Sequence, residues 1–461
     1  MHARARPLSL QSAMTARRLA VVGAGWAGLA AAVRGVLAGW QVTLFEMAPA
    51  AGGRARSLAA DADGTRLDNG QHILIGAYRR TLDLMATVGA DPARLLHRQP
   101  LELRYPDGAG LRLPPGPAWL VFGVGVAGAR GWSTRDKLAL MAAAGRWMLA
   151  GFRCAPGLSV DALCRGLPPA VRQRLIDPLC VAALNTPAHE ASAAVFLRVL
   201  RDSLFSGPGS SDLLLPRAPL AALLPEPAVA WLHGRGAAVH TGRRVARLDA
   251  AATGWAVDGE AFDAVVLAAS AAESARLAAP HAASWAARAA GFGYEPIVTV
   301  IVDAPGLRLP APMMALQDGA QAPAQFVFDH AALGGPAGQL AFVISGAAPW
   351  VAQGLEATAA ATLQQAARAF GGTGWPAAAR VRRTLAEKRA TFRCVPGLDR
   401  PPAAIAPGLV AAGDFLEGPY PATLEGAVRS GEDAVRALAA WWPASAAALP
   451  PARRAPPAAR R

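Results

Sequence analysis

The sequence predicts an α/β fold in which a nucleotide-binding domain is assembled from separate stretches of the chain and interleaved with a second domain of mixed sheet and helices. Three observations support this prediction. A glycine-rich turn joins an apolar strand to an alanine-rich helix, strand signals return in the middle and near the end, and helical and antiparallel patterns lie between them. The 461 residues, 53% of them hydrophobic, suffice for two packed cores.

The first predicted elements form a βαβ pattern. The apolar run LAVVG at 19–23 is typical of a parallel strand that is buried on both faces. An alanine-rich helix follows and is predicted to stop at Gly39, after which WQVTLFE at 40–46 forms a second strand. A strand, a helix and a second strand within thirty residues make the smallest unit of a parallel sheet.

A glycine motif lies at the first turn of this unit. Gly23, Gly25 and Gly28 have the G-x-G-x-x-G spacing, in which the glycines allow a tight turn, an approach of the backbone to a pyrophosphate, and close packing of helix on strand. Glu46 ends the second strand, where a carboxylate can bond ribose hydroxyls. The unit is therefore predicted to be Rossmann-like, with dinucleotide phosphates at the helix N-terminus.

Two further segments, AGGRARS at 51–57 and GLVAAGDFLEGPYPATLEGAVRSG at 408–431, resemble the FAD motifs of the amine oxidase and phytoene desaturase superfamily. The resemblance implies that Arg54 meets the diphosphate, that Asp414 bonds the ribityl chain, and that a helix starting at Thr423 points its N-terminus at the flavin. We therefore expect tightly bound FAD. The predicted cofactor-binding residues are Gly23, Gly25, Trp26, Ala27, Gly28, Glu46, Gly53, Arg54, Gly70, Val245, Gly413, Asp414, Thr423 and Leu424.

The remaining elements follow from hydrophobic period and turn residues. The expected elements are a hairpin at 101–113 turning at Asp107-Gly108, helices within 132–205, strands within 237–270, an antiparallel sheet at 296–395 with a helix near 355–371, a buried strand at 408–415 and a helix at 423–442. The predicted division is an FAD-binding domain of 17–100, 216–290 and 396–442, a substrate-binding domain with a helical cap of 101–215 and 291–395, and flexible basic arms at 1–16 and 443–461.

The formal charge of +14 does not indicate nucleic-acid binding, because eight of the basic residues lie within residues 1–18 and 453–461 and the others are scattered without interleaved aromatics. The four cysteines lack zinc-site spacing and are predicted to be free thiols. The apolar stretch within 112–130 contains three prolines and is too short for a transmembrane helix.

Four stretches resemble a narrower family, the bacterial hydroxysqualene dehydroxylases. They are LDNGQHILIGAY, PLCVAALNTPAHEASAAVFLRVLRDSLF, DLLLPRAPLAALLP and PATLEGAVRSG, within a resemblance that covers about residues 17–440. One departure is EGPY at 417–420, where the family more often has Thr-Gly. The resemblance implies reductive removal of the hydroxyl of 12-hydroxysqualene to give squalene in hopanoid biosynthesis, with hydride passing from N5 of reduced FAD to an allylic cation. NADPH or another reductant would reload the flavin.

The reaction implied by this resemblance needs an acid and a dry apolar tunnel. His72 and Asp177 are the candidate acids and Asn185 the candidate for orienting the substrate hydroxyl, although each could equally be a cap or a core hydrogen-bonder. The aromatic residues of the helical segment that could line or cover the tunnel are Trp119, Phe122, Trp132 and Trp147. No metal site is expected at LDNGQHILIGAY, because one His, one Asp and amides are a poor ligand set.

Two other functions remain open. The same fold could carry out oxidative desaturation of a carotenoid or squalene-like polyene, or the chain could be a non-catalytic terpenoid carrier. In every case the partner is a long apolar isoprenoid rather than a nucleic acid. We expect a cytoplasmic protein that contacts the inner membrane peripherally and takes its substrate over from the enzyme that makes hydroxysqualene.

Overall fold

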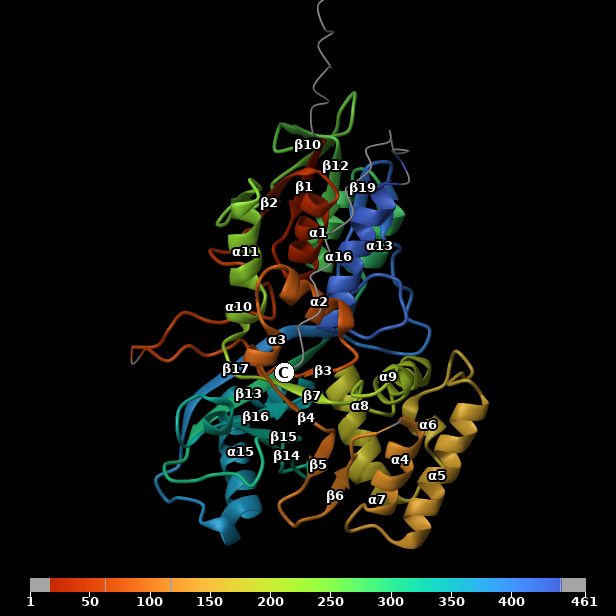
Figure 1. Ribbon diagram of the computed structural model, residues 1–461, viewed down its shortest axis with the longest axis vertical. Helices are drawn as coiled ribbons and strands as arrows, with labels where there is room; N and C mark the ends of the chain where they lie inside the picture. Colours follow the sequence, from red (N-terminus) through yellow and green to blue (C-terminus); the bar gives the residue numbers. More distant parts are fainter. Residues whose placement is uncertain (1–16, 63, 117, 440, 442–461) are drawn as a thin grey trace, which may run out of the picture.

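The computed structural model describes residues 17–62, 64–116, 118–439 and 441. Figure 1 shows two lobes: a sheet with its covering helices at the top, and a second sheet beside a group of helices at the bottom. The chain passes between the lobes several times, so each lobe contains segments that are far apart in the sequence. The predicted flexible arms, 1–16 and 443–461, lie outside the described residues.

The upper lobe is built on a six-stranded sheet. Its order is β18 (Ala404–Ala406), β19 (Leu409–Ala411), β12 (Ala264–Leu267), β1 (Arg18–Val22), β2 (Gln41–Phe45) and β8 (Ala238–His240). All neighbours are parallel except β18, which runs antiparallel to β19. Strand β12 is buried throughout, as expected for a continuous apolar run between helical layers. The strands predicted at the start, middle and end of the sequence thus meet in one sheet.

Three helices lie side by side against this sheet in Figure 1: α11 (Pro225–Gly234), α1 (Trp26–Leu37) and α16 (Leu424–Ala439). The other helices of the lobe are α2 (Arg79–Thr87), α3 (Pro92–Leu95), α10 (Leu220–Leu223), α12 (Ala271–Ala278) and α13 (Ala283–Ala290). Helix α16 approaches α1 closely at Gly431, where a Cβ would lie 2.1 Å from the carbonyl oxygen of Ala27.

The lower lobe contains the predicted antiparallel sheet. Its order is β14 (Met313–Ala315), β15 (Phe326–Asp329), β16 (Gln339–Ile344), β13 (Tyr294–Asp303) and β17 (Arg380–Phe392). Helix α15 (Leu355–Phe370) packs on it, which confirms the helix expected near 355–371. The short elements beside it are α14 (Ala348–Gln353), η2 (His330–Leu333) and η3 (Gly371–Thr373). Strand β14 is an element that the sequence pattern did not predict.

Three small sheets complete the strands. The predicted hairpin forms from β5 (Glu102–Arg104) and β6 (Gly110–Arg112), and Gly108 in its turn has a φ of +80°. A separate meander contains β9 (Leu248–Ala250), β10 (Trp255–Val257) and β11 (Glu260–Phe262). The third contains β3 (Leu74–Ile75), β7 (Leu213–Pro216) and β4 (Leu96–Gln99). Strand β7 lies at the end of the predicted substrate-binding segment 101–215, but it pairs with β3 and β4 of the predicted FAD-binding segment 17–100. The predicted domain boundary near residue 216 therefore stays a prediction.

A group of helices occupies the lower right of Figure 1, where a helical cap was predicted. It comprises α4 (Ala118–Ala127), α5 (Thr134–Leu149), α6 (Val160–Leu163), α7 (Pro169–Val171), the π-helical turn η1 (Arg172–Ile176), α8 (Asp177–Leu184) and α9 (Ala193–Phe205). Helix α5 ends at Leu149, just before Gly151 and Phe152, which take positive φ values. Within the described residues, no helix combines the length and apolarity needed to cross a bilayer.

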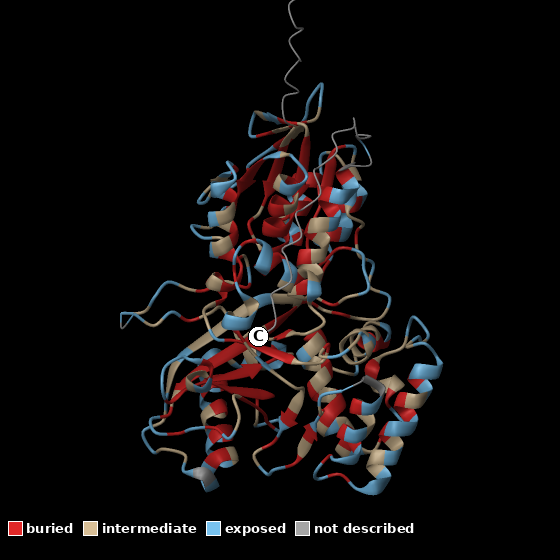
Figure 2. Cartoon of the chain, viewed as in Figure 1, coloured by how far each residue is buried: buried red, intermediate tan, exposed pale blue. Residues whose placement is uncertain are grey.

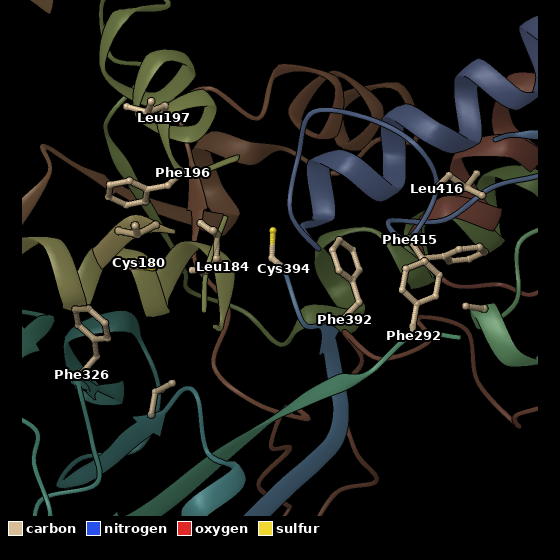
Figure 3. Packing of buried hydrophobic residues seen from close by; sticks show 14 of the residues in the cluster. Cys180, Leu184, Phe196, Leu197, Phe292, Phe326, Phe392, Cys394, Phe415 and Leu416 are labelled. Atoms are coloured by element: carbon tan, nitrogen blue, oxygen red, sulfur yellow. The ribbon is translucent and has the colours of Figure 1, made fainter. Parts of the chain in front are cut away.

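Buried aromatic residues join the two lobes. Figure 3 shows Phe292, Phe392 and Phe415 together, and their ring centroids lie 5.7 Å (Phe292 to Phe392) and 6.1 Å (Phe292 to Phe415) apart. Phe292 precedes β13, Phe392 ends β17 and Phe415 follows β19, so this contact fixes the lower sheet against the upper one. Figure 2 shows the buried residues continuing from one lobe into the other.

Candidate active site

A single cavity of about 1100 Å³ is lined by residues of both lobes. One part is polar and glycine-rich, and includes Gly25, Glu46, Arg54, Asp414 and Thr423. The other part is apolar and is lined by the helical group and by the lower sheet. A nucleotide cofactor and a large apolar substrate can therefore meet within one cavity.

The glycine turn between β1 and α1 has no room for side chains. Gly23 has a φ of +107°, and a Cβ there would lie 2.6 Å from the carbonyl oxygen of Ala268. A Cβ on Gly28 would lie 1.8 Å from the carbonyl oxygen of Gly23, so this glycine serves the packing of α1 on the turn. Of the predicted cofactor-binding residues, Gly28 alone is not part of the cavity lining. It packs against the carbonyl group of Gly23 instead.

The Gly-Gly-Arg segment lies directly against this turn. A Cβ on Gly53 would lie 3.1 Å from the Cα of Gly25, and the N–H of Gly52 donates to the carbonyl oxygen of Ala24 at 2.8 Å. Because neither Gly25 nor Gly53 has a side chain, the backbone of both segments is exposed to the cavity beside the N-terminus of α1. The first N–H groups of this helix have no partner within the helix. This part of the cavity, the glycine groove, can receive the phosphates of a dinucleotide.

Glu46 is buried at the end of β2 and holds the turn in place. Its Oε2 accepts a hydrogen bond from the N–H of Ala24 at 2.7 Å, and its Oε1 accepts one from Ala48 at 2.8 Å. The carboxylate also lines the cavity beside Val245. This is the position from which an acidic side chain reaches ribose hydroxyls.

Arg54 and Asp414 bond to each other, a contact that the sequence did not predict. Nη2 of Arg54 lies 2.6 Å from each carboxylate oxygen of Asp414, and Nη1 donates to the carbonyl oxygen of Ala390 at 2.8 Å. Both residues line the cavity. The pair links the Gly-Gly-Arg segment to the turn that follows β19, so it fixes two of the three predicted FAD motifs relative to each other.

The start of α16 faces the same cavity. Thr423 caps the helix, its Oγ1 accepting from the N–H of Gly426 at 3.0 Å, and Thr423 and Leu424 both line the cavity. Behind them, Ser430 Oγ accepts from the N–H of Gly413 at 2.7 Å. The positive end of the helix dipole therefore points at the cavity, where it favours negative charge on a bound group.

One hydroxyl in the cavity wall has no hydrogen-bond partner among the described residues. Thr299, on β13, is 2% exposed, and its Oγ1 has no hydrogen-bond partner. This oxygen lies close to Gly70, since a Cβ on Gly70 would be 3.7 Å from it. A buried hydroxyl without a partner costs free energy. A ligand in the cavity would supply the missing partner, so the glycine groove, the carboxylate and this hydroxyl together fit FAD and a bound substrate.

The comparison with known families agrees with this geometry. The family described as flavin containing amine oxidoreductase matches residues 26–439, nearly the whole described chain. The chain belongs to this family. It is therefore an FAD-dependent oxidoreductase, and its α/β architecture is that of the family.

The chain is similar along nearly its whole length to one named enzyme. It is 29% identical to the hydroxysqualene dehydroxylase of Rhodopseudomonas palustris over 452 residues, which is 90% of this chain and 96% of the relative. It is 31% identical to that of Sinorhizobium fredii over 50% of this chain and 54% of the relative. A probable zeta-carotene desaturase of Synechococcus elongatus is 45% identical, but over only 16% of this chain and 15% of the relative.

Solved structures share the fold. The putative protoporphyrinogen oxidase of Exiguobacterium sp. 255-15 superposes with a TM-score of 0.65 over 92% of this chain and 99% of its own, at 17% identity. An oxidoreductase of Methanosarcina mazei gives 0.68 over 91% of this chain and 100% of its own, also at 17% identity. These likenesses show that the fold is shared.

His72 lines the cavity, as expected of a residue that meets the substrate. Its Nδ1 lies 3.0 Å from the carbonyl oxygen of Gly70, which requires a proton on Nδ1. Burial lowers the pKa of His72, so the ring is neutral near pH 7 and leaves Nε2 as an acceptor. A neutral ring that carries its proton on Nδ1 can accept a hydrogen bond at Nε2, and the catalytic role of His72 stays a prediction.

The neighbours of His72 in LDNGQHILIGAY are structural. Asp68 accepts from Ser57 Oγ at 2.6 Å and from the N–H of Leu220 at 3.0 Å, so it braces the segment. Asn69 donates to the carbonyl oxygen of Arg54 and to Glu387. Gly70 has a φ of +100°, a conformation that favours glycine, and lines the cavity as predicted.

The second predicted acid, Asp177, and the residue predicted to orient the substrate hydroxyl, Asn185, are placed differently from His72. Asp177 starts α8 and is not among the residues that line the cavity, so the structure does not bring it to the site. Asn185 lines the cavity, but its amide is fully engaged: Nδ2 donates to Glu295 O at 3.1 Å and Thr391 Oγ1 at 3.0 Å, and Oδ1 accepts from Gly346 N at 2.7 Å. With a φ of 46° it ends α8 as a left-handed cap, and it ties that helix to the lower sheet.

The apolar part of the cavity has the aromatic lining that was expected. Phe122 of α4 and Trp147 of α5 line it, together with Phe205. Trp132 is buried outside the lining, and the side chain of Trp119 lies outside the described residues. The long side chains of α9 and the lower sheet that complete this part are Phe196, Val199, Leu200, Phe326 and Phe328.

A polar cluster in the cavity wall was missed. Tyr420 Oη donates to Asp202 Oδ2 at 2.6 Å, while Arg198 contacts both, with Nε 2.8 Å from Oδ2 and Nη2 3.1 Å from Oη. Asp202 and Tyr420 line the cavity. Arg198 and Asp202 are an i,i+4 pair on α9. The one available signal was that Tyr420 belongs to EGPY, the stretch at which the sequence departs from the resemblance to the hydroxysqualene dehydroxylases.

Proposed function

We propose that the chain catalyses the FAD-dependent reductive dehydroxylation of 12-hydroxysqualene to squalene. The observation that carries this proposal is the extent of the similarity: the hydroxysqualene dehydroxylase of R. palustris is matched over 90% of this chain, whereas the carotene and phytoene desaturases are matched over 16–22%. The shared stretch with the desaturases is short enough to reflect the cofactor site alone, since both groups bind FAD in this superfamily.

The form of the cavity supports a long apolar substrate. The polar groove and the apolar part are continuous, and phenylalanines from α4, α9 and β15 surround the apolar part. A C30 hydrocarbon makes few hydrogen bonds, so its binding depends on apolar area removed from water. Exclusion of water also protects a carbocation formed during the reaction.

Replacing the hydroxyl by hydrogen needs a hydride, which brings two electrons and the hydrogen of the new C–H bond, and a proton for the oxygen that leaves as water. Reduced FAD, when bound, supplies the electrons that turn the C–O bond into a C–H bond. The chain itself must supply the proton and hold the hydroxyl. An allylic position eases loss of water, because the positive charge that develops is delocalised over the double bond.

We assign the proton supply to the Tyr420–Asp202 pair. The proton on Tyr420 Oη is shared with Asp202 Oδ2 at 2.6 Å, and Arg198 holds both oxygens from one side. Burial and the Asp202 carboxylate raise the pKa of Tyr420, so its phenol is protonated at neutral pH and carries the proton that the leaving hydroxyl needs. The same shift makes the phenol a weak acid, so the proposed transfer takes place as the C–O bond breaks. The unpartnered Thr299 Oγ1 and the Nε2 of His72 are the groups proposed to orient that hydroxyl.

The test is an incubation of purified, FAD-loaded protein with 12-hydroxysqualene and NADPH or dithionite under nitrogen. We expect squalene as product, detected by gas chromatography with mass spectrometry. Y420F and D202N are expected to lower kcat at least tenfold, with unchanged melting temperature and FAD content. R429K, which alters a neighbouring cation near the Tyr420 ring, is the matched control. Absence of squalene with every reductant would refute the proposal.

The alternative is oxidative desaturation. It is favoured by the local similarity to zeta-carotene desaturase, 45% over 73 residues. The same protein, with oxidised FAD and a quinone acceptor, would then convert phytoene or squalene into products with additional double bonds and would leave hydroxysqualene unchanged.

A further inference from the structure

Exposed apolar side chains gather on two helices of the helical group. Among the described residues, ten large hydrophobic side chains are exposed, and six of these belong to α4 and α5. Leu149 is 92% exposed and Leu138 is 65% exposed, the two highest values of the ten. The six residues, which we call the α4–α5 face, are Leu120, Val124, Leu138, Met141, Met148 and Leu149. A face of this kind on a monomer indicates contact with another apolar phase.

Helix α5 has two apolar sides. Leu140, Ala143, Ala144 and Trp147 are buried at helical spacing and form the side that packs inward. The exposed residues of α5 are Leu138, Met141, Met148 and Leu149. At about 100° per residue they fall within one arc of the helix that is displaced from the buried side, so they form a second side. Helix α4 adds Leu120 and Val124, and it adjoins α5 where a Cβ on Gly123 would lie 3.8 Å from Met141 Cε.

The charge around this face is positive. The stretch 130–153 contains five basic residues and one acid, Asp136, which is engaged in the capping box of α5 with Ser133. Arg135 and Arg146 lie on α5 beside its outward apolar side, and both are exposed. Apolar residues flanked by exposed arginines match the interface of an anionic bilayer, where the acyl region takes the former and the phosphates take the latter.

The two helices that carry the α4–α5 face also form part of the cavity wall. Phe122 of α4 and Leu140, Ala144 and Trp147 of α5 line the cavity from the inner sides of the same two helices. In Figures 1 and 2, α5 lies at the outer edge of the lower lobe and carries exposed residues along its length. We propose that the α4–α5 face docks on an anionic lipid bilayer and holds the apolar part of the cavity next to the acyl chains.

This inference does not depend on the identity of the substrate, because binding is tested without one. The FAD-loaded full chain is sedimented with vesicles of phosphatidylcholine alone and of phosphatidylcholine with phosphatidylglycerol. We expect binding to the anionic vesicles that weakens as salt is raised. L138S/L149S is expected to lower the partition coefficient at least tenfold, because burying one leucine side chain is worth a factor of roughly ten or more.

The matched control is L37S/L355S, which removes two exposed leucines from α1 and α15, outside the α4–α5 face. It should bind vesicles like the unmodified protein, and both double variants should keep the melting temperature. Equal vesicle binding by L138S/L149S and the unmodified protein would overturn the proposal. So would a dimer, seen by light scattering, that L138S/L149S dissociates while vesicle binding is absent, because the face would then be an interface between two copies. Squalene formation in detergent micelles tests the proposed function separately.

Discussion

The packing of α16 on α1 leads to a prediction about Gly431, which lies within α16. A Cβ on Gly431 would be 2.1 Å from the carbonyl oxygen of Ala27, a backbone atom that cannot rotate away. Ordinary contacts of this kind begin at about 3 Å, so G431A requires the two helices to separate by about 1 Å. Both helices point their N-termini at the cavity, and this separation would widen the cofactor groove between Gly25 and Thr423.

The cost can be worked out from two opposing effects. Overpacking of a close contact costs about 1–3 kcal/mol, and a rigid backbone partner places G431A at the upper end. Alanine gains about 1 kcal/mol over glycine as a helix former, so the net loss in free energy of unfolding is about 2 kcal/mol. We expect a melting temperature lower by roughly 2–6 °C and a smaller fraction of FAD retained after gel filtration.

Gly145 is the matched control, because it also lies within a helix, α5, and nothing lies within 4 Å of a Cβ placed there. G145A should therefore raise the melting temperature slightly or leave it unchanged, with FAD content unaffected. The measurements are thermal melts by circular dichroism and flavin absorbance per protein. The reasoning is refuted if G431A melts at or above the temperature of the unmodified protein with full FAD content.

Three further predictions concern the cavity. T299V removes the unpartnered hydroxyl with little change of shape, so the melting temperature should hold or rise while kcat falls, and a fall in both would contradict the assignment. In the unfolded state His72 takes up a proton as the pH falls below about 6.5, which the folded state resists, so acidification from pH 7 to pH 5 lowers stability. H72Q should therefore lose less melting temperature over this range, with His330, whose pKa is also lowered by burial, contributing equally to both proteins. R54K keeps the charge but loses the fork that joins Asp414 and Ala390, and dialysis should show FAD retention about tenfold weaker; unchanged retention would mean that the fork is dispensable.

The sequence predicted those features that depend on local spacing. A tight turn, a buried strand and a hairpin each need particular residue types at a few neighbouring positions. Examples are the glycines of the first turn, the apolar runs of β1 and β12, and the hairpin at Asp107-Gly108. The chain order of the FAD motifs was informative for the same reason, since each motif combines a strand end with a turn. The free cysteines also follow from spacing alone.

The boundaries and extra elements needed the tertiary structure. Strand β7 pairs with β3 and β4, a contact between distant segments that no period in the sequence expresses. The run at 237–250 was expected to be strand-like, but only its two ends, β8 and β9, are strands, because they belong to different sheets. Pairing between distant segments decided both cases.

The sequence by itself determined that this chain has a dinucleotide turn, an FAD-type Gly-Gly-Arg segment and a third motif before the last helix. Only the tertiary structure decided which polar residues face the cavity. Asp177 and Tyr420 show why: the Asp177 carboxyl is not part of the cavity lining, while the Tyr420 phenol lines the cavity and bonds to Asp202, 218 residues away along the chain. Direction of a side chain is set by packing across the whole molecule, which the local pattern of residues does not contain.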